Sequence, residues 1–334
     1  MPLLDSSYSP PFGFSNGFVQ TIFPTLFRRL RDDFLLRERI PTPDQDFLDL
    51  DWSRVGSETL VIVSHGLTGS SRGHYVLGTV LEANRHGWDA LAWNYRGCSG
   101  EVNTQLRLYH SGATDDLDVV VQHALAQGYS RIHLVGFSMG GNLSLLYAGR
   151  SANSLPSEIE SVSAFSVPCD LEACAYELAK PSNRIFMSRF LKELGENLRA
   201  KASQYPTHVD LNGFAKIRTF AEYDERYTAP IHGFRSAVDY WNKSSCLSYL
   251  ADIRIPALMV NAQNDPFLPE QCYPRAIARS HANFYFEEPT SGGHVGFIQR
   301  NPDHVYWMEG RAMAFIREQG GNLPIAVPLA EESA

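Results

Sequence analysis

Short runs of mostly apolar residues alternate along this chain with segments whose apolar residues recur at helical spacing. The runs are rich in β-branched and aliphatic side chains, which is typical of strands buried in a parallel sheet. They cover residues 59–64, 90–95, 132–135, 162–167, 255–261 and 283–287. Helical patterns cover residues 74–86, 114–127, 143–148 and 305–318. The alternation predicts an α/β fold, in which helices flank a mostly parallel central sheet and right-handed crossovers join its strands.

The N-terminal region, residues 1–50, is less regular. Phe18, Ile22 and Leu26 lie near helical spacing, although Pro24 interrupts the pattern. We predict that this region is an arm that packs its apolar face on the core. The alternative is a segment that contacts a membrane surface or belongs to a lid, because aromatic residues and arginines are interleaved there. Residues 47–52 alternate between apolar and polar side chains and predict an edge strand.

The alternation breaks off between residues 170 and 249, where helical patterns continue without a convincing strand. A connection of roughly 80 residues greatly exceeds ordinary loop lengths and requires a structure of its own. We therefore predict a helical cap at residues 169–249, inserted between two parts of the core at residues 51–168 and 250–320. Residues 321–334 are expected to form a loose C-terminal tail.

Composition narrows the functional classes. The chain has 334 residues, of which 44% are hydrophobic, and this is enough for a large core. Its formal net charge of -8 and the lack of a long basic run argue against nucleic acid as a partner. We expect no membrane span and no signal peptide, because no long apolar stretch is found. The five cysteines are scattered without a Cys-x-x-Cys pair, so we expect a cytoplasmic protein without disulfides or zinc.

The candidate chemistry begins at the run 132–135, which leads into the pattern Gly-x-Ser-x-Gly at residues 136–140. A strand before this pattern and a helix after it are the context of a nucleophile elbow, a sharp turn that exposes the serine hydroxyl. Side chains at Gly136 or Gly140 would collide with the neighbouring turn. Ser138 is therefore the candidate nucleophile, although the five-residue pattern by itself also occurs by chance.

A serine hydroxyl needs a base that takes its proton. His294 lies in a glycine-rich loop between the last predicted strand and the last helix, where a base is expected. A third group must orient the imidazole, and Asp265 follows the run 255–261 directly. Asp170, after the run 162–167, is the alternative acid. The order serine, aspartate, histidine distinguishes this arrangement from other lineages of serine hydrolase.

The oxyanion of an acyl-transfer reaction needs two backbone N–H donors. Met139 follows the candidate nucleophile, and Leu67 lies in the loop after the run 59–64, so both are candidates for this oxyanion hole. Glu222, Asp224 and Glu225 could suggest a metal site, but their spacing is more typical of a solvated helix face. The chain has neither a dinucleotide fingerprint nor a phosphate-binding loop motif, and the chemistry needs no cofactor and no metal.

Several further segments point to one family. They are residues 12–17 with 20–22, 65–70, 94–97, 136–141, 223–230 with 233–234, and 264–266. With these segments the chain resembles the α/β-hydrolases, and more narrowly their YheT-like branch, also called the AB hydrolase-4 family. The resemblance covers most of the chain and implies the nucleophile, acid and base roles for Ser138, Asp265 and His294. It also implies hydrolysis of carboxylic esters, with relatives that act on short- to medium-chain acyl esters or on lipids.

Our leading hypothesis is a serine carboxylesterase that forms an acyl-enzyme and takes a small acyl ester or a lipid as its substrate. The cap would supply an acyl pocket, for which its apolar residues Phe186, Met187, Phe190 and Leu191 are candidates. The alternatives are an acyltransferase that passes the acyl group to an alcohol, a lipid-directed lipase, and a non-catalytic binding protein that keeps the fold. The sequence does not determine the physiological substrate or the oligomeric state.

Overall fold

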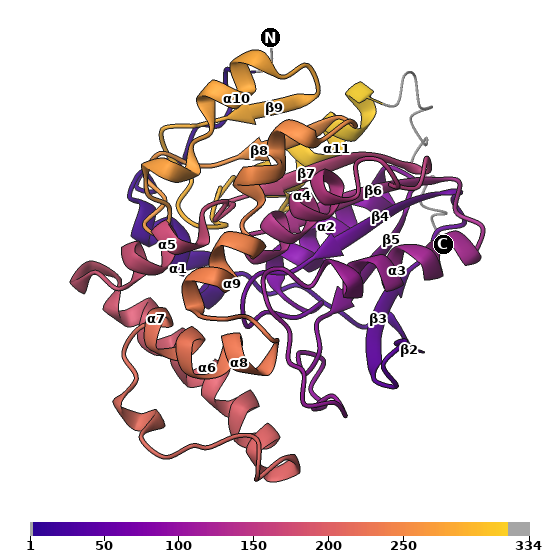
Figure 1. Ribbon diagram of the computed structural model, residues 1–334. Coiled ribbons are helices and arrows are strands. Elements are labelled where there is room, and N and C mark those ends of the chain that lie inside the picture. Colours follow the sequence, from indigo (N-terminus) through magenta and orange to yellow (C-terminus); the bar gives the residue numbers. More distant parts are fainter. Residues whose placement is uncertain (1–2, 320–334) are drawn as a thin grey trace.

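The centre of the molecule is a nine-stranded sheet with the order β1-β9-β8-β7-β6-β4-β5-β3-β2 (Figure 1). The computed structural model describes residues 3–319. The strands are β1 (Leu3–Leu4), β2 (Leu36–Pro41), β3 (Phe47–Ser53), β4 (Thr59–Ser64), β5 (Asp89–Asn94), β6 (Arg131–Phe137), β7 (Ile159–Phe165), β8 (Ala257–Val260) and β9 (Phe284–Glu287). The strand β6, which carries the serine motif at its end, has the middle position in this order.

In this spatial order, each strand from β1 through β9, β8, β7, β6 and β4 to β5 is parallel to the next. Only β3 runs antiparallel to its two neighbours, β5 and β2. The prediction of a mostly parallel α/β sheet is confirmed. The prediction of an edge strand at residues 47–52 is wrong, because β2 pairs along the outer side of β3. The N-terminal region thus adds one strand to each edge of the sheet.

Helices cover both faces of the sheet (Figure 1). One face packs against α2 (His74–Arg85) and α11 (Trp307–Gln319), whose apolar side chains share a cluster with β4 and β8. The other face packs against α3 (Thr114–Ala126), α4 (Met139–Arg150) and α10 (Arg275–Ser280). Among residues 3–319, no helix has the length and the apolar character needed to cross a bilayer. The predicted tail, residues 321–334, lies outside the described residues.

Between β7 and β8 the chain forms helices and no strand, in agreement with the break in the sequence pattern. The α-helices here are α5 (Leu171–Leu178), α6 (Arg184–Gln204), α7 (Phe220–Tyr223), α8 (Ala229–Ile231) and α9 (Ala237–Ser244), and residues 224–228 form one turn of π-helix. Several of them gather at the lower left of the sheet in Figure 1. Most of their apolar side chains form two further clusters, whereas Cys174 of α5 belongs to a core beside the sheet.

The helix α1 (Gly17–Phe27) forms in the N-terminal region, and Pro24 lies within it. Asn16 caps its first turn, because the Asn16 side chain accepts hydrogen bonds from two backbone N–H groups. Elsewhere in this region Leu4, Tyr8, Phe34 and Leu35 pack on the core, but α1 does not turn an apolar face to it. The residues that α1 buries are Gly17, Gln20 and Pro24, whereas most of its large apolar side chains remain exposed. Contacts with the loops beneath α1, described below, explain this orientation.

Candidate active site

Ser138 lies at the sharp turn between β6 and α4, with φ 54° and ψ -119°. This is a strained conformation for a residue with a side chain, and it is held by the structure around it. The Ser138 N–H donates to the carbonyl oxygen of Phe165, at a distance of 2.8 Å. A Cβ on Gly136 would overlap with the Gly140 carbonyl, and one on Gly140 would overlap with the Ser64 carbonyl. Both glycines of the motif are therefore required by close backbone contacts.

The structure brings Ser138, His294 and Asp265 together, although they are far apart in the sequence. The His294 Nε2 atom lies 2.9 Å from Ser138 Oγ, and His294 Nδ1 lies 2.8 Å from Asp265 Oδ2. Since an ionised carboxylate only accepts hydrogen bonds, Asp265 favours the tautomer with its proton on Nδ1. The Nε2 atom is then able to accept the serine proton. The Asp265 carboxylate is buried, and its Oδ1 atom accepts from the Phe267 N–H.

The alternative acid, Asp170, does not join this arrangement. Its carboxylate caps its own helix, α5, by accepting from the Ala173 N–H at 3.0 Å. Both aspartates follow a strand, so their place in the sequence alone does not show which of them contacts the imidazole. The hydrogen bond to His294 distinguishes Asp265.

The loops that carry Asp265 and His294 are fixed to each other by Asn264. Its Oδ1 atom accepts from the Gly293 N–H at 3.0 Å, and its Nδ2 atom donates to the Ser15 carbonyl at 2.8 Å. Helix α1 packs on both loops, because the Thr21 hydroxyl accepts from the His294 N–H at 2.9 Å. The N-terminal region therefore helps to position the imidazole, and this role was not predicted from the sequence.

The candidate oxyanion donors line the same pocket as Ser138. On either side of Leu67, the Gly66 N–H donates to the Tyr75 hydroxyl and the Thr68 N–H donates to the Tyr109 hydroxyl. Within the part of the chain that the structure describes, the Leu67 N–H itself has no hydrogen-bond partner. Met139 is the first residue of α4, where backbone N–H groups have no partner within the helix. Both donors are thus available for a ligand.

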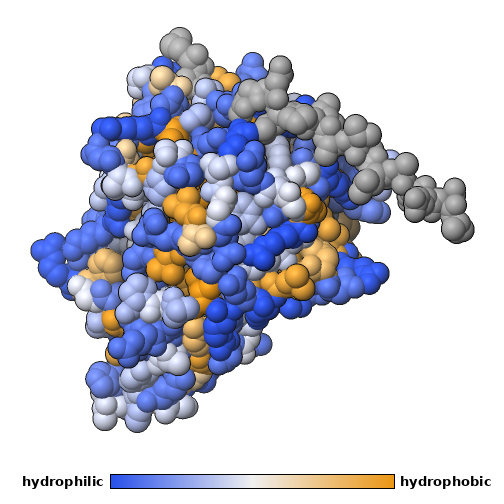
Figure 2. All heavy atoms as spheres, turned by 90° about the vertical axis from the view of Figure 1, so that its right-hand side faces the viewer, coloured by the Kyte–Doolittle hydropathy of each residue, from blue (hydrophilic) through white to orange (hydrophobic). Residues whose placement is uncertain are grey.

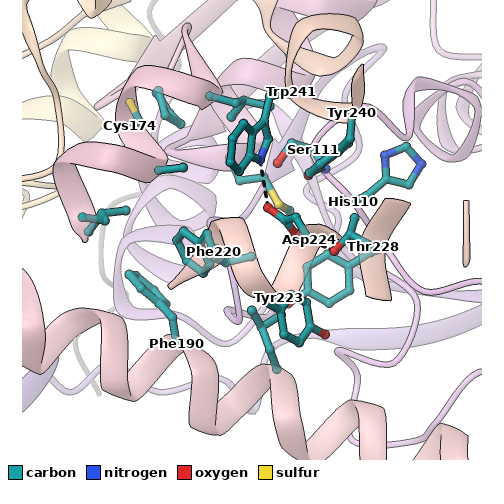
Figure 3. A pocket seen from close by; sticks show the side chains of 18 of the residues that line it. His110, Ser111, Cys174, Phe190, Phe220, Tyr223, Asp224, Thr228, Tyr240 and Trp241 are labelled. Atoms are coloured by element: carbon teal, nitrogen blue, oxygen red, sulfur yellow. Dashed lines mark hydrogen bonds between the residues drawn. The ribbon is translucent and has the colours of Figure 1, made fainter. Parts of the chain in front are cut away.

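A pocket extends from Ser138 and His294 into the segment between β7 and β8. Most of its lining is apolar or aromatic, and Figure 3 shows Phe190, Phe220 and Tyr223 among these side chains. Of the four predicted acyl-pocket residues, Phe190 lines the pocket. Met187 and Leu191 are buried in the cluster behind it, and Phe186 packs on Phe267 with ring centroids 4.7 Å apart. Helical periodicity identified apolar residues here without showing which of them face the pocket.

One acidic residue was misjudged from the sequence. Asp224 does not lie on a solvated face, because its carboxylate is buried in the pocket wall. It accepts from the indole N–H of Trp241 at 2.8 Å, drawn as a dashed line in Figure 3, and from the Thr228 hydroxyl at 2.6 Å. Burial raises the pKa of Asp224 to about 6. The one-turn π-helix that begins at Asp224 directs this polar group to the pocket, and no simple sequence pattern signals it.

Other histidines near the site have structural contacts. His65 is buried, its Nδ1 atom lies 2.8 Å from the Gly66 carbonyl, and burial lowers its pKa to about 4. His110 lines the pocket and packs against His232, with ring centroids 4.6 Å apart. Among residues 3–319, no three His, Cys, Asp or Glu side chains are grouped so that they could hold a metal ion.

Comparisons with known proteins agree with this architecture. A family model described as alpha/beta hydrolase fold matches residues 59–300. The chain is 34% identical over 314 residues to Putative esterase YheT of Escherichia coli (strain K12), and the match covers 92% of each protein. It is 27% identical over 309 residues to Phospholipase ABHD3 of Homo sapiens, with 89% of this chain and 75% of that protein covered. A solved esterase of Pyrococcus furiosus has a similar fold, with a TM-score of 0.58, 18% identity, and coverage of 93% and 100%.

Proposed function

Because the chain belongs to the α/β-hydrolase family, in its YheT-like branch, we propose that it is a serine carboxylesterase for short- to medium-chain acyl esters. The observation that carries the proposal is the continuous chain of hydrogen bonds from Ser138 through His294 to Asp265. Ser138 and His294 also line a largely apolar pocket. The names of the relatives, an esterase and a phospholipase, support an ester or lipid substrate.

In the first half of the reaction, His294 Nε2 takes the proton of the Ser138 hydroxyl, and Ser138 Oγ attacks the carbonyl carbon of the ester. The carbonyl oxygen becomes an oxyanion, to which the N–H groups of Leu67 and Met139 donate hydrogen bonds. Asp265 stabilises the imidazolium that forms. When the tetrahedral intermediate collapses, the bond to the alcohol breaks, and His294 gives its proton to the leaving alcohol.

In the second half, His294 Nε2 takes a proton from a water molecule, whose oxygen attacks the acyl carbon of the acyl-enzyme. The bond between Ser138 Oγ and the acyl carbon then breaks, and the proton returns to Ser138. The products are a carboxylic acid and the free enzyme. No metal or cofactor has a role in these steps. Replacement of the water by an alcohol would turn the same site into an acyltransferase.

The acyl chain occupies the pocket between the core and residues 169–249, which we assign as the cap. The pocket is lined by residues of both parts, for example Leu67 and Met139 of the core and Phe190 and Phe220 of the assigned cap. Burial of methylene groups contributes roughly 0.8 kcal/mol each to binding of the chain. The remaining core then comprises residues 51–168 and 250–320.

The proposal is tested with Ser138→Ala and a series of p-nitrophenyl esters of increasing acyl length. We expect the wild-type protein to hydrolyse them with a preference for short to medium chains, and Ser138→Ala to lose this activity. Ser203→Ala, at an exposed position on α6, serves as the matched control and is expected to behave as wild type. An unchanged rate in Ser138→Ala would refute the proposal. A fluorophosphonate probe should label the wild-type serine, and product analysis in the presence of an alcohol separates hydrolysis from acyl transfer.

A further inference from the structure

Helix α1 turns its apolar side chains towards the solvent. Leu26 and Phe27 are 55% and 66% exposed, and Phe12, in the preceding loop, is fully exposed. Ile185, at the start of α6, is 78% exposed. Together with the remaining exposed side chains of α1 these residues form a surface that we call the α1 patch. It consists of Phe12, Phe18, Val19, Ile22, Leu26, Phe27 and Ile185.

Contacts between aromatic rings show that the segments that carry the α1 patch are neighbours. Phe14, next to the loop of Phe12, packs on Phe23 of α1, with ring centroids 4.9 Å apart. Phe18 stacks on Phe186, the neighbour of Ile185, at 6.0 Å. The loop, helix α1 and the start of α6 are therefore side by side. Exposed apolar side chains that gather on neighbouring segments are typical of an interaction site.

The face turned to the viewer in Figure 2 differs from this arrangement. Hydrophilic residues dominate it, and apolar residues form small separate clusters. It includes the side with β2 and α3, which lies opposite α1 in Figure 1. Of the eleven large apolar side chains that are exposed among residues 3–319, seven belong to the α1 patch.

Arginines surround the α1 patch. Arg29 follows α1, Arg184 precedes Ile185, and the Arg300 guanidinium lies 5.7 Å from the ring centroid of Phe14. None of these three forms an ion pair with another residue in the range 3–319. The nearby acids Asp32 and Asp33 are already paired, with Arg72 and Arg31 respectively. On a protein whose net charge is -8, this edge therefore presents positive charge beside an apolar surface.

The charge indicates which occupant fits. In a symmetric contact between two copies of the chain, the arginines around one patch would face those around the other, and like charges would repel. An anionic lipid surface fits both the positive charge and the apolar side chains of this edge. Its headgroups pair with the arginines, while the apolar side chains enter the boundary between headgroups and acyl chains. We propose that the α1 patch docks this protein on an anionic lipid surface. The docking extends beyond the proposed esterase activity and does not depend on it.

The location of the α1 patch relates this docking to the candidate active site. The Phe18 and Phe186 rings continue inward to Phe267, whose ring centroid lies 4.3 Å from that of His294. The opposite side of α1 holds the loop of His294 through Thr21. A lipid surface at the patch would thus lie on the same side of the molecule as the catalytic loops.

The experiment measures co-sedimentation with phosphatidylcholine vesicles prepared with or without phosphatidylglycerol. We expect the wild-type protein to bind vesicles that contain phosphatidylglycerol, and the variant Leu26→Ser/Phe27→Ser/Ile185→Ser to bind them at least about tenfold more weakly. The matched control is Leu36→Ser/Val55→Ser/Val238→Ser, which removes three apolar side chains exposed elsewhere and should bind as wild type. The variant Arg29→Ala/Arg184→Ala/Arg300→Ala should lose the preference for phosphatidylglycerol.

Hydrolysis of a soluble ester, together with the melting temperature, reports whether each variant is folded, since none of the substituted side chains lines the pocket. Wild-type protein that does not bind the anionic vesicles would overturn the proposal, as would equal binding by the α1 patch variant and its control. A wild-type dimer that the α1 patch variant converts to a monomer in size-exclusion chromatography would also overturn it, because the patch would then be covered by a second copy.

Discussion

The hydrogen bond between Thr21 of α1 and the backbone of His294 can be removed almost without a change of shape. In Thr21→Val, a methyl group replaces the hydroxyl that accepts from the His294 N–H at 2.9 Å and donates to the Gly17 carbonyl at 2.7 Å. This hydrogen bond is partly buried, so water has limited access to the N–H group that loses its acceptor. The substitution therefore tests whether α1 positions the catalytic loop.

An unsatisfied N–H group of this kind costs about 1–3 kcal/mol. If the loop moves to find another acceptor, His294 leaves its position 2.9 Å from Ser138 Oγ, and the cost appears in the activation barrier. Since about 1.4 kcal/mol corresponds to a tenfold change in rate, kcat is expected to fall by about 5- to 150-fold. KM should change by less than about twofold, because Thr21 does not line the pocket and uniform binding is retained.

The assay is hydrolysis of p-nitrophenyl butyrate, with kcat and KM measured over a range of pH. Thr25→Val is the control, because Thr25 lies one turn further along α1 and its hydroxyl makes no hydrogen bond with the residues that the structure describes. Thr21→Ser restores the acceptor and should recover most of the activity. If Thr21→Val had the same kcat and melting temperature as Thr25→Val, α1 would not position His294 and the reasoning would be refuted.

Three further predictions concern the acid, the pocket and the cap. Asp265→Asn should lower kcat by about 10³- to 10⁴-fold with little change in KM, because an amide also accommodates the wrong imidazole tautomer; a loss below about tenfold in steady-state kinetics would contradict this. Phe190→Ala should shift the preference in an ester series to longer acyl chains, whereas Met187→Ala, in the cluster behind the pocket, should destabilise the protein by about 2–4 kcal/mol in urea denaturation without such a shift. Lys201→Met should destabilise the protein by about 2–4 kcal/mol, because the Lys201 ammonium donates to the carbonyls of Asn103 and Gln105. Burial lowers the pKa of the Lys201 ammonium to about 8. Between pH 8 and the ordinary pKa of a lysine, the unfolded chain therefore binds more protons than the folded protein, and the free energy of unfolding should rise with pH. This rise should disappear in Lys201→Met.

The strands that could be predicted from the sequence are those that are buried on both faces of the sheet, because this burial determines their apolar pattern. β4 and β6 are largely apolar because helices cover both faces of the sheet there. β1 and β2 lack such a pattern, since one has two residues and the other, Leu36–Pro41, is largely exposed and contains Arg37, Glu38 and Arg39. Their pairing depends on neighbouring strands rather than on their own composition. The same distinction applies to Asp224, whose burial results from the fold of the segment around it.

The glycines around His294 have a packing role that the sequence does not reveal. The sequence identifies this loop only as glycine-rich and as following the last predicted strand. The structure adds a packing requirement, because a Cβ on Gly293 or Gly296 would lie 2.5 Å from a backbone oxygen of α1. Gly17 of α1 is equally constrained, since its Cβ would overlap with the Asn264 carbonyl. Three glycines from distant parts of the sequence thus allow one helix to approach the loops of both Asp265 and His294. This close contact requires small residues on the side of α1 that faces the loops. The large apolar side chains of α1 therefore lie on its other side, towards the solvent.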